Sequence, residues 1–267
     1  MLDLPAYFHR IDYSGAREPT LETLRALHLR HPIAIPFETL DPLCGRPVSL
    51  DLRALQRKLV TERRGGYCFE QNLLFGEVLR ALGFQVRSLA ARVLWGRPDD
   101  LRARTHMLLF VQLGEGAYLC DVGFGALTMT APLRLEPDVD QTTPHEVFRV
   151  LRRGNEFVLE ATLNGERKPL YCFDLQEQLP IDIEVLNHFV STHPDSPFLS
   201  SLMAARPLAD RRYGLRDHRL SVHYADGSSQ LQELTSVPEL RGVLVETFGI
   251  NVPEDHGVDE ALGRLFD

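Results

Sequence analysis

The chain has 267 residues, of which 44% are hydrophobic and 25% are charged, as in a globular protein with one large domain or a few small ones. Its formal net charge of −8 argues against a general nucleic-acid-binding surface, and apolar runs such as "MLLFV" are too short to cross a bilayer. The N-terminal stretch "MLDLPAYFHRIDYSG" lacks the basic and apolar regions of a signal peptide. We therefore expect a cytoplasmic protein that binds neither nucleic acid nor membrane.

The cysteines argue against both a disulfide framework and a four-thiolate zinc site, because no two of them form a C-x-x-C pair. They are Cys44, Cys68, Cys120 and Cys172. In a reducing compartment an isolated cysteine is either a small core residue or a nucleophile. His28 and His31 have a metal-ligand spacing, but no acidic or thiol ligand set accompanies them, so we expect no metal site.

The first third of the chain has the pattern of helices. Apolar residues recur at helical spacing in "TLETLRALHLRHP", and this helix is predicted to end before Pro32. The stretch "SLDLRALQRKLV" has the same character, with Ser49 or Asp51 as its N-cap. A third helix is predicted from about residue 69 to residue 82, with Gly83 as its C-terminal cap.

Residues from about 85 to 175 have the pattern of antiparallel strands, because short apolar and β-branched runs alternate with Gly and Pro. Asn164-Gly165 is a strong hairpin signal within them. In the last third, "IDIEVLNHFVSTHP" indicates a helix, "LSVHYADGSSQLQEL" two strands, and "SVPELRGVLVETFG" a helix capped by Ser236. This order predicts an α+β fold in three parts, with residues 1–84 helical, 85–179 a curled sheet or barrel, and 180–267 mixed.

The stretch "RRGGYCFE", residues 63–70, places Cys68 at the start of a predicted helix. A sulfur there lies near the positive end of the helix dipole and the unpaired N–H groups of the first turn, both of which favour thiolate over thiol. Gly65 and Gly66 permit a tight backbone approach, which suits a loop that packs close to a substrate. The alternative is a structural turn around a small buried thiol.

A basic partner for this thiol is predicted from two strands that follow. His106 opens the apolar strand "HMLLFV", and Asp121 follows the strand "AYLC", where a carboxylate is costly unless it is paired. If the strands form a hairpin through Gly114 and Gly116, the two residues are roughly symmetric about the turn and lie close together. By itself His106 could equally be a satisfied strand-edge residue. Together with Cys68, the pair predicts the nucleophile, base and orienting acid of an acyl-transfer site.

In these motifs the sequence resembles the arylamine N-acetyltransferases. The resemblance lies in "RGGYCFEQN" with Cys68, "THMLLFV" with His106 and "DVGFG" with Asp121. The upstream segment "HLRHPIAIPFETLD" is also similar to that family, with Thr39 where Asn is usual. The match covers about residues 5–130, and "PDSPF" adds a looser match in the last third.

The resemblance implies a helical bundle, an antiparallel β-barrel and an α/β lid around a cysteine-protease-like catalytic core. It implies ping-pong transfer of an acetyl group from acetyl-CoA, through a cysteine thioester, to the nitrogen of an arylamine, arylhydrazine or N-hydroxyarylamine, without a metal. By similarity, the acceptor pocket is lined by Phe37, Val93, Phe124 and Phe198, and Thr105 contacts the coenzyme. Apolar and aromatic walls suit a flat aryl ring, although each of the four pocket residues taken singly could be a core residue.

Other functions stay open at this point. An amide synthase, or a hydrolase of the transglutaminase or cysteine-protease type, would use the same three side chains with a different acceptor. A non-catalytic binding module would keep the fold without the reactivity. The arginine-rich residues 206–219 could meet coenzyme phosphates, but Asp210 and Asp217 favour a self-paired surface there.

Overall fold

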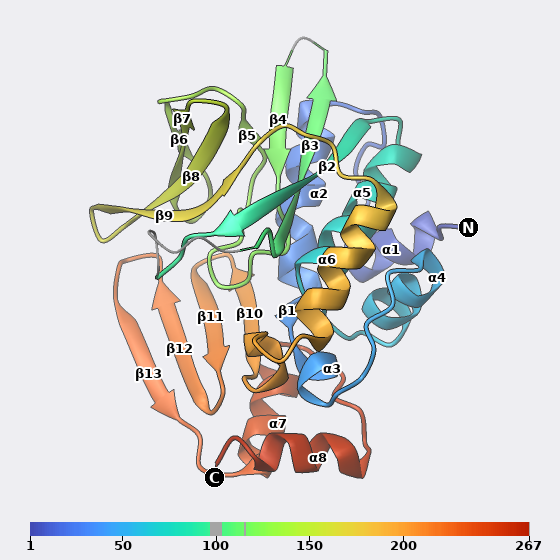
Figure 1. Cartoon of the computed structure of the whole chain (residues 1–267), viewed down its shortest axis with the longest axis vertical. Coiled ribbons are helices and arrows are strands. Elements are labelled where there is room, and N and C mark those ends of the chain that lie inside the picture. Colours follow the sequence, from blue (N-terminus) through green and yellow to red (C-terminus); the bar gives the residue numbers. More distant parts are fainter. Residues whose placement is uncertain (97–102, 115, 267) are drawn as a thin grey trace.

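The computed structural model describes residues 1–96, 103–114 and 116–266. It shows helices packed against a curled sheet and a second, open sheet (Figure 1), which confirms the predicted α+β class. The helical elements are α1 (Leu4–Arg10), α2 (Leu21–Ala34), α3 (Leu40–Leu43), α4 (Leu52–Leu55), η1 (Gln56–Thr61), α5 (Cys68–Ala81), α6 (Pro180–Thr192), η2 (Pro197–Leu199), α7 (Val237–Glu246) and α8 (His256–Gly263). Within the described residues, every helix is too short or too polar to span a bilayer.

The strands follow in the same chain order. They are β1 (Phe37–Glu38), β2 (Gln85–Val93), β3 (His106–Leu113), β4 (Gly116–Cys120), β5 (Leu133–Arg134), β6 (Asp140–Thr142), β7 (Val147–Arg153), β8 (Glu156–Leu163), β9 (Glu166–Phe173), β10 (Met203–Leu208), β11 (Arg211–Arg216), β12 (Arg219–Tyr224) and β13 (Ser229–Glu233).

Helix α2 does not end before Pro32, and that prediction was wrong. The helix continues to Ala34, and the N–H of Ile35 still donates to the carbonyl of His31 at 2.7 Å. Proline disfavours a helical conformation at the residue before it, which is His31. Tertiary contacts override this preference, because the His31 ring is buried and hydrogen-bonded on both nitrogens, to the Tyr7 hydroxyl at 2.8 Å and to Gln71 at 2.7 Å.

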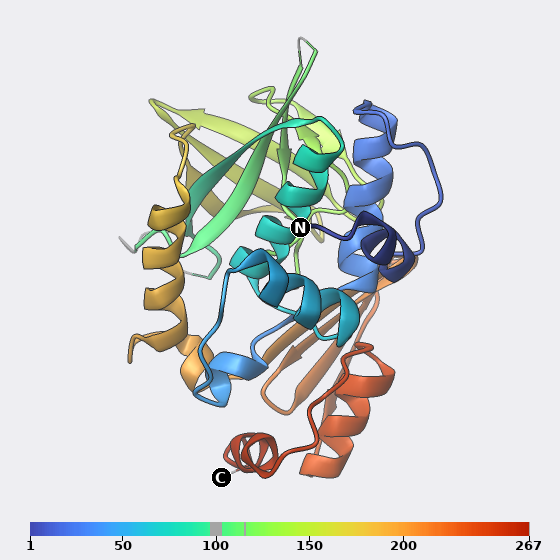
Figure 2. The ribbon, with the colours of Figure 1, turned by 90° about the vertical axis from the view of Figure 1, so that its right-hand side faces the viewer.

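The two helices that flank the cysteine loop form largely as predicted. Asp51 is the N-cap before α4 and accepts from two first-turn N–H groups, while the following turns, η1, are π-helical. Helix α5 begins at Cys68, one residue earlier than expected. Gly83 has the left-handed φ of +89° that a helix C-terminus favours. In Figure 2, α2, α4 and α5 lie together on one side of the curled sheet.

The curled sheet has eight strands in the order β5-β4-β3-β2-β9-β8-β7-β6, all antiparallel. The edge strands β5 and β6 meet through Gln141, whose side-chain amide donates to the carbonyl of Arg134 at 2.8 Å and accepts from its N–H at 2.7 Å. The sheet is therefore nearly closed into the predicted barrel. Asn164 and Gly165, with φ of +50° and +79°, form the predicted β8–β9 hairpin turn.

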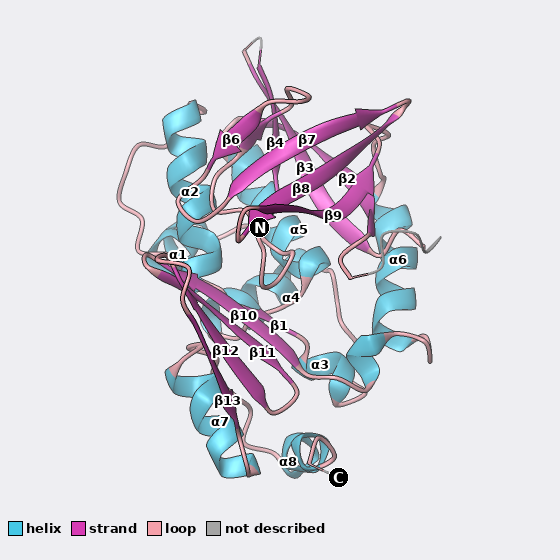
Figure 3. Ribbon diagram, turned by 90° about the vertical axis from the view of Figure 1, so that its left-hand side faces the viewer, coloured by secondary structure: helices cyan, strands magenta, loops and turns pink. Residues whose placement is uncertain are grey.

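The second sheet, β1-β10-β11-β12-β13, joins distant parts of the sequence. Strand β1 comes from the first part of the chain and pairs with β10, so that Phe37 lies opposite Ala205. Helices α7 and α8 lie against this sheet (Figure 3) and share an apolar core with it. Ile183 and Val190 of α6 pack instead into the core of the N-terminal helices. The division at residues 84 and 179 stays a prediction, and elements on either side of those boundaries share cores and a sheet.

Candidate active site

Cys68 is the first residue of α5 and is 4% exposed. Its thiol donates a long hydrogen bond, 3.8 Å, to the carbonyl oxygen of Thr105, the residue before His106. The tight approach predicted for Gly65 and Gly66 is present, but it is made to the protein itself. A Cβ on Gly65 would lie 2.2 Å from the Pro36 carbonyl oxygen, and one on Gly66 would lie 2.6 Å from the Glu70 carboxylate. The glycines thus shape the loop by internal packing.

The predicted hairpin is present and brings His106 to Asp121. Strands β3 and β4 pair antiparallel, with Leu113 opposite Gly116 and Leu109 opposite Cys120. Beyond this ladder the His106 Nε2 lies 2.7 Å from Asp121 Oδ2, and both side chains are buried. The structure therefore brings together all three residues that the sequence singles out.

The electrostatics of this group favour a charged histidine. Burial lowers the pKa of His106, but the charge and hydrogen bond of Asp121, with a smaller effect of Cys68, outweigh burial and raise that pKa to about 10. For Asp121, burial raises the pKa, but the imidazolium and the hydrogen bonds to the carboxylate outweigh it and hold that pKa below its ordinary value. The arrangement can thus keep an imidazolium beside the Cys68 sulfur, which stabilises a thiolate.

Asn72 is a part of this site that the sequence interpretation missed. Its Nδ2 donates to Asp121 Oδ1 at 3.0 Å and to the carbonyl of Met107 at 2.8 Å, and its Oδ1 accepts from the N–H of Val122 at 3.1 Å. It follows Cys68 by four residues on α5 and so lies on the same helix face. That spacing is the signal that could have found it.

A cluster of buried and half-buried charges lies behind the start of α5. Glu70 accepts from the Tyr67 N–H at 3.0 Å, as in a capping box, and from the Lys58 ammonium at 2.7 Å. Lys58 also pairs with Asp41 at 2.6 Å, and Arg64 with Glu38 at 2.7 Å. Three carboxylates and two cations therefore fix the loop that precedes Cys68.

The four residues expected to line the acceptor pocket are all half-buried and fall into two aromatic groups. Phe37 lies edge-to-face with Phe198, with ring centroids 6.2 Å apart. Phe124 lies edge-to-face with the His106 ring at 5.0 Å. Val93 pairs across the strands with Tyr171, whose ring is 5.1 Å from Phe124. A Cβ on Gly125, next to Phe124, would lie 3.7 Å from the Phe37 ring, so the two groups are adjacent.

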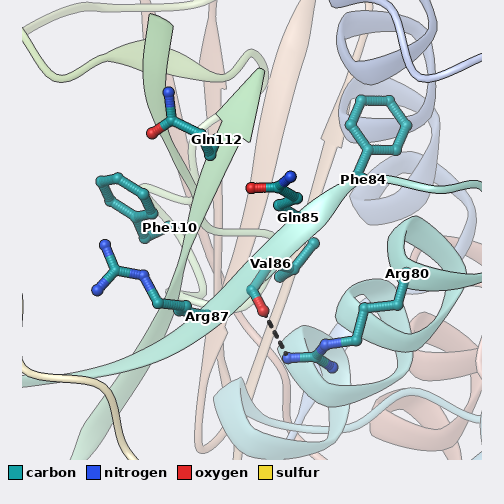
Figure 4. Close-up of a pocket in the computed structure, with 7 residues that line it drawn as sticks. All are labelled: Arg80, Phe84, Gln85, Val86, Arg87, Phe110 and Gln112. Atoms are coloured by element: carbon teal, nitrogen blue, oxygen red, sulfur yellow. Dashed lines mark hydrogen bonds between the residues drawn. The ribbon is translucent and has the colours of Figure 1, made fainter. Parts of the chain in front are cut away.

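A surface hollow of about 360 Å³ lies elsewhere, where the C-terminal end of α5 meets strands β2 and β3. Figure 4 shows its lining, in which Arg80 donates to the Val86 carbonyl and Arg87 points towards Phe110. It includes neither Cys68 nor the residues of the expected acceptor pocket. The arginine-rich residues 206–219 form at least one ion pair among themselves, since Arg211 pairs with Asp210 at 2.6 Å.

The fold and sequence are those of the N-acetyltransferases, since a family model of that description matches residues 20–256. The chain is 44% identical to an arylamine N-acetyltransferase of Mycolicibacterium smegmatis, covering 97% of this chain and 95% of that protein. It is 45% identical to one of Escherichia coli, covering 95% and 92%. The solved structure of Mycobacterium marinum arylamine N-acetyltransferase in complex with CoA superposes with a TM-score of 0.95 at 43% identity, covering 98% of this chain and 99% of that one. The chain belongs to the arylamine N-acetyltransferase family.

Proposed function

We propose that this chain transfers an acetyl group from acetyl-CoA to the nitrogen of an arylamine, an arylhydrazine or an N-hydroxyarylamine, with Cys68 as the acetyl carrier. The observation that carries the assignment of Cys68 is its place at the start of α5 beside the buried His106–Asp121 pair. The chain matches relatives that are named for this activity, and each match covers nearly the whole chain. This family membership supports acetyl transfer over an amide synthase or a hydrolase.

The first half-reaction needs a nucleophile and an acid. The Cys68 thiolate attacks the thioester carbonyl carbon of acetyl-CoA, and the carbonyl oxygen becomes an oxyanion. The Cys68 main-chain N–H opens α5, where first-turn N–H groups lack a helix partner, so it is our candidate oxyanion donor. The C–S bond to CoA breaks, His106 protonates the departing sulfur, and an acetyl thioester stays on Cys68. Thr105, whose carbonyl oxygen accepts a hydrogen bond from the Cys68 thiol, would contact the coenzyme.

The second half-reaction needs a base and a flat apolar pocket. The acceptor nitrogen attacks the acetyl carbon, neutral His106 takes its proton, and the C–S bond breaks to release the amide and restore the thiolate. Phe37, Val93, Phe124 and Phe198 would hold the aryl ring, because aromatic walls bind a flat ring and leave its nitrogen free. Asp121 would keep the imidazole oriented throughout.

The mass of the isolated protein after incubation with acetyl-CoA alone tests the proposal. We expect one added acetyl group, located on the peptide that contains Cys68 and lost when an arylamine or hydrazine is added. Cys172→Ala is the matched control, because Cys172 is a half-buried free thiol away from the helix start, and it should acetylate as the wild type does. A Cys68→Ala protein that still releases CoA in the presence of amine would contradict the proposal.

We also propose a cytoplasmic location. All four cysteines, which lie within the described residues, are free thiols, as is usual in a reducing compartment. Fractionation of cells that express the chain, followed by an assay of acetyl transfer in each fraction, tests this location.

A further inference from the structure

We infer that His28, on helix α2, is a positioning residue for Asp121, through a hydrogen bond to its main chain. The inference rests on the proposed role of Asp121 beside His106. It adds a contact that reaches the acid from a residue 93 positions earlier in the chain.

The contact is made where the backbone leaves the barrel. The last pair in the β3–β4 ladder is Leu109 with Cys120, so the N–H of Asp121 lies one residue beyond it. That N–H donates to His28 Nε2 at 3.1 Å, and both residues are fully buried. A buried N–H needs a partner, and here the partner is a side chain of α2.

The direction of this hydrogen bond fixes the state of the His28 ring. A ring nitrogen that accepts must be unprotonated, so the single proton of neutral His28 lies on Nδ1. Burial lowers the pKa of His28 to about 4, although the nearby Asp121 charge acts in the opposite sense, so the ring is neutral at physiological pH. The neighbouring Phe75 ring lies at right angles to the imidazole, with 5.7 Å between the ring centroids.

Pro32 lies one helical turn after His28 and changes the main-chain surroundings of that residue. Within the described part of the chain, buried Nδ1 has no hydrogen-bond partner on another residue. Pro32 stands four residues after His28 and has no N–H, so it cannot donate to the His28 carbonyl as a helical residue would. The His28 main chain also acts on the imidazole of its own residue and raises its pKa against the larger effect of burial.

Asp121 is thereby held at both its main chain and its carboxylate. Asn72 and the N–H of Gly123 hold Oδ1, at 3.0 Å and 2.9 Å, and His106 meets Oδ2. Among the residues that the structure describes, the acceptor for the Asp121 N–H is His28 Nε2. Without that acceptor, the buried N–H is unsatisfied, and the segment must shift or admit water to satisfy it, which moves the carboxylate away from His106.

Four variants test the role of His28, with kcat, KM for acetyl-CoA and the rate of Cys68 alkylation by iodoacetamide across pH as readouts. His28→Leu removes the acceptor. His28→Gln places an amide oxygen near the former Nε2, whereas His28→Asn is too short to reach the Asp121 N–H. His31→Leu is the matched control, because His31 is equally buried on the same helix but bonds Tyr7 and Gln71.

We expect His28→Leu and His28→Asn to lower kcat by between about 10-fold and about 100-fold with KM unchanged, and to slow alkylation at neutral pH. His28→Gln should recover most of the kcat and most of the alkylation rate. His31→Leu should lower stability without changing how the alkylation rate depends on pH. If His28→Leu does not fold, the comparison of Gln with Asn decides.

The role of His28 is overturned if folded His28→Asn matches His28→Gln in both kcat and the rate of alkylation, or if His31→Leu slows alkylation as much as His28→Leu does. The wild type separates this failure from that of the proposed function. A wild-type Cys68 that is not acetylated by acetyl-CoA overturns both, whereas normal acetylation with unaffected His28 variants overturns the positioning role alone.

Discussion

Gly123 lies so close to Cys68 that a Cβ on the glycine would come within 2.8 Å of the Cys68 Cα. The same Cβ would lie 3.1 Å from the Asn72 side-chain nitrogen. The loop that follows Asp121 therefore rests directly on the first turn of α5. This contact sets the distance between the sulfur-bearing helix and the loop that carries the acid.

Gly123→Ala should lower kcat/KM by about 100-fold or more, because the loop must move away from α5 and small displacements of reacting groups are costly. Gly242→Ala is the control, since a Cβ there meets open space on helix α7 and alanine favours a helix. Steady-state kinetics with circular dichroism check both variants. Wild-type activity in folded Gly123→Ala would show that the contact is dispensable.

Asn72→Asp should lower kcat strongly while preserving side-chain size. The change replaces the Nδ2 donor by an oxygen that faces Asp121 Oδ1, so two carboxylates compete for one proton and the pKa of Asp121 rises. We expect a loss of about 100-fold, measured as CoA release with a hydrazine acceptor. Asn251→Asp, at an exposed position, is the control. Equal activities of the two variants would contradict the role of Asn72.

The raised pKa of His106 predicts an alkaline limit of activity. Its proton stays bound through neutral pH and is lost as the pH rises through about 10, so kcat/KM for acetyl-CoA should fall there. The raised pKa of His106 also stabilises the folded state. This contribution is fully present below the unfolded pKa of about 6.5, and it disappears as the pH rises towards the folded pKa. In Asp121→Asn the alkaline limb should move down towards about 6.5. A limb that does not move would rule out Asp121 as its cause.

The two buried neutral histidines predict a loss of stability on mild acidification. Burial lowers the pKa of His28 to about 4 and that of His31 to about 3, whereas the unfolded chain protonates both near pH 6.5. Their contribution is present above pH 6.5 and is lost as the pH falls towards those folded values, with a slope of up to roughly 2.7 kcal/mol per pH unit. Urea unfolding between pH 5 and pH 6.5 measures it. His31→Gln should about halve the slope, and an unchanged slope would refute this origin.

Lys58→Met should destabilise the protein by about 3 kcal/mol, because it leaves Asp41 and Glu70 without their shared cation. Adding Glu70→Gln to the same chain should restore part of this loss. Asp41 keeps its pair with Arg64 at 3.1 Å, and the carboxylate that Lys58 leaves unpaired is then neutral. Arg57→Met is the control, because Arg57 pairs with Glu62 on the surface, where ion pairs contribute little. Denaturant unfolding of the wild type, Lys58→Met, Glu70→Gln and the double variant gives the coupling, and strictly additive effects would contradict it.

Local patterns predicted those parts of the site that depend on short-range geometry. The β3–β4 hairpin follows from strand signals around one turn, and its register alone brings His106 to Asp121. Contacts between distant segments could not be predicted in that way. The contact of His28 with Asp121, and that of the Pro36 carbonyl with Gly65, depend on how α2, α5 and the barrel pack together. Such packing produces no repeating pattern of residues in the sequence. For the same reason the local rule at Pro32 failed, because buried hydrogen bonds outweighed it.

The pairing of β1 with β10 also has a consequence for how the chain matures on the ribosome. The thiol, the imidazole and the carboxylate have all been synthesised once residue 121 has been added. The strand that flanks Phe37 begins only at Met203, and Thr39 bonds to that residue through its main chain and its hydroxyl. A nascent chain of intermediate length therefore contains the three reactive groups before the strand beside Phe37 has been made, so the proposed acceptor pocket is completed late in translation.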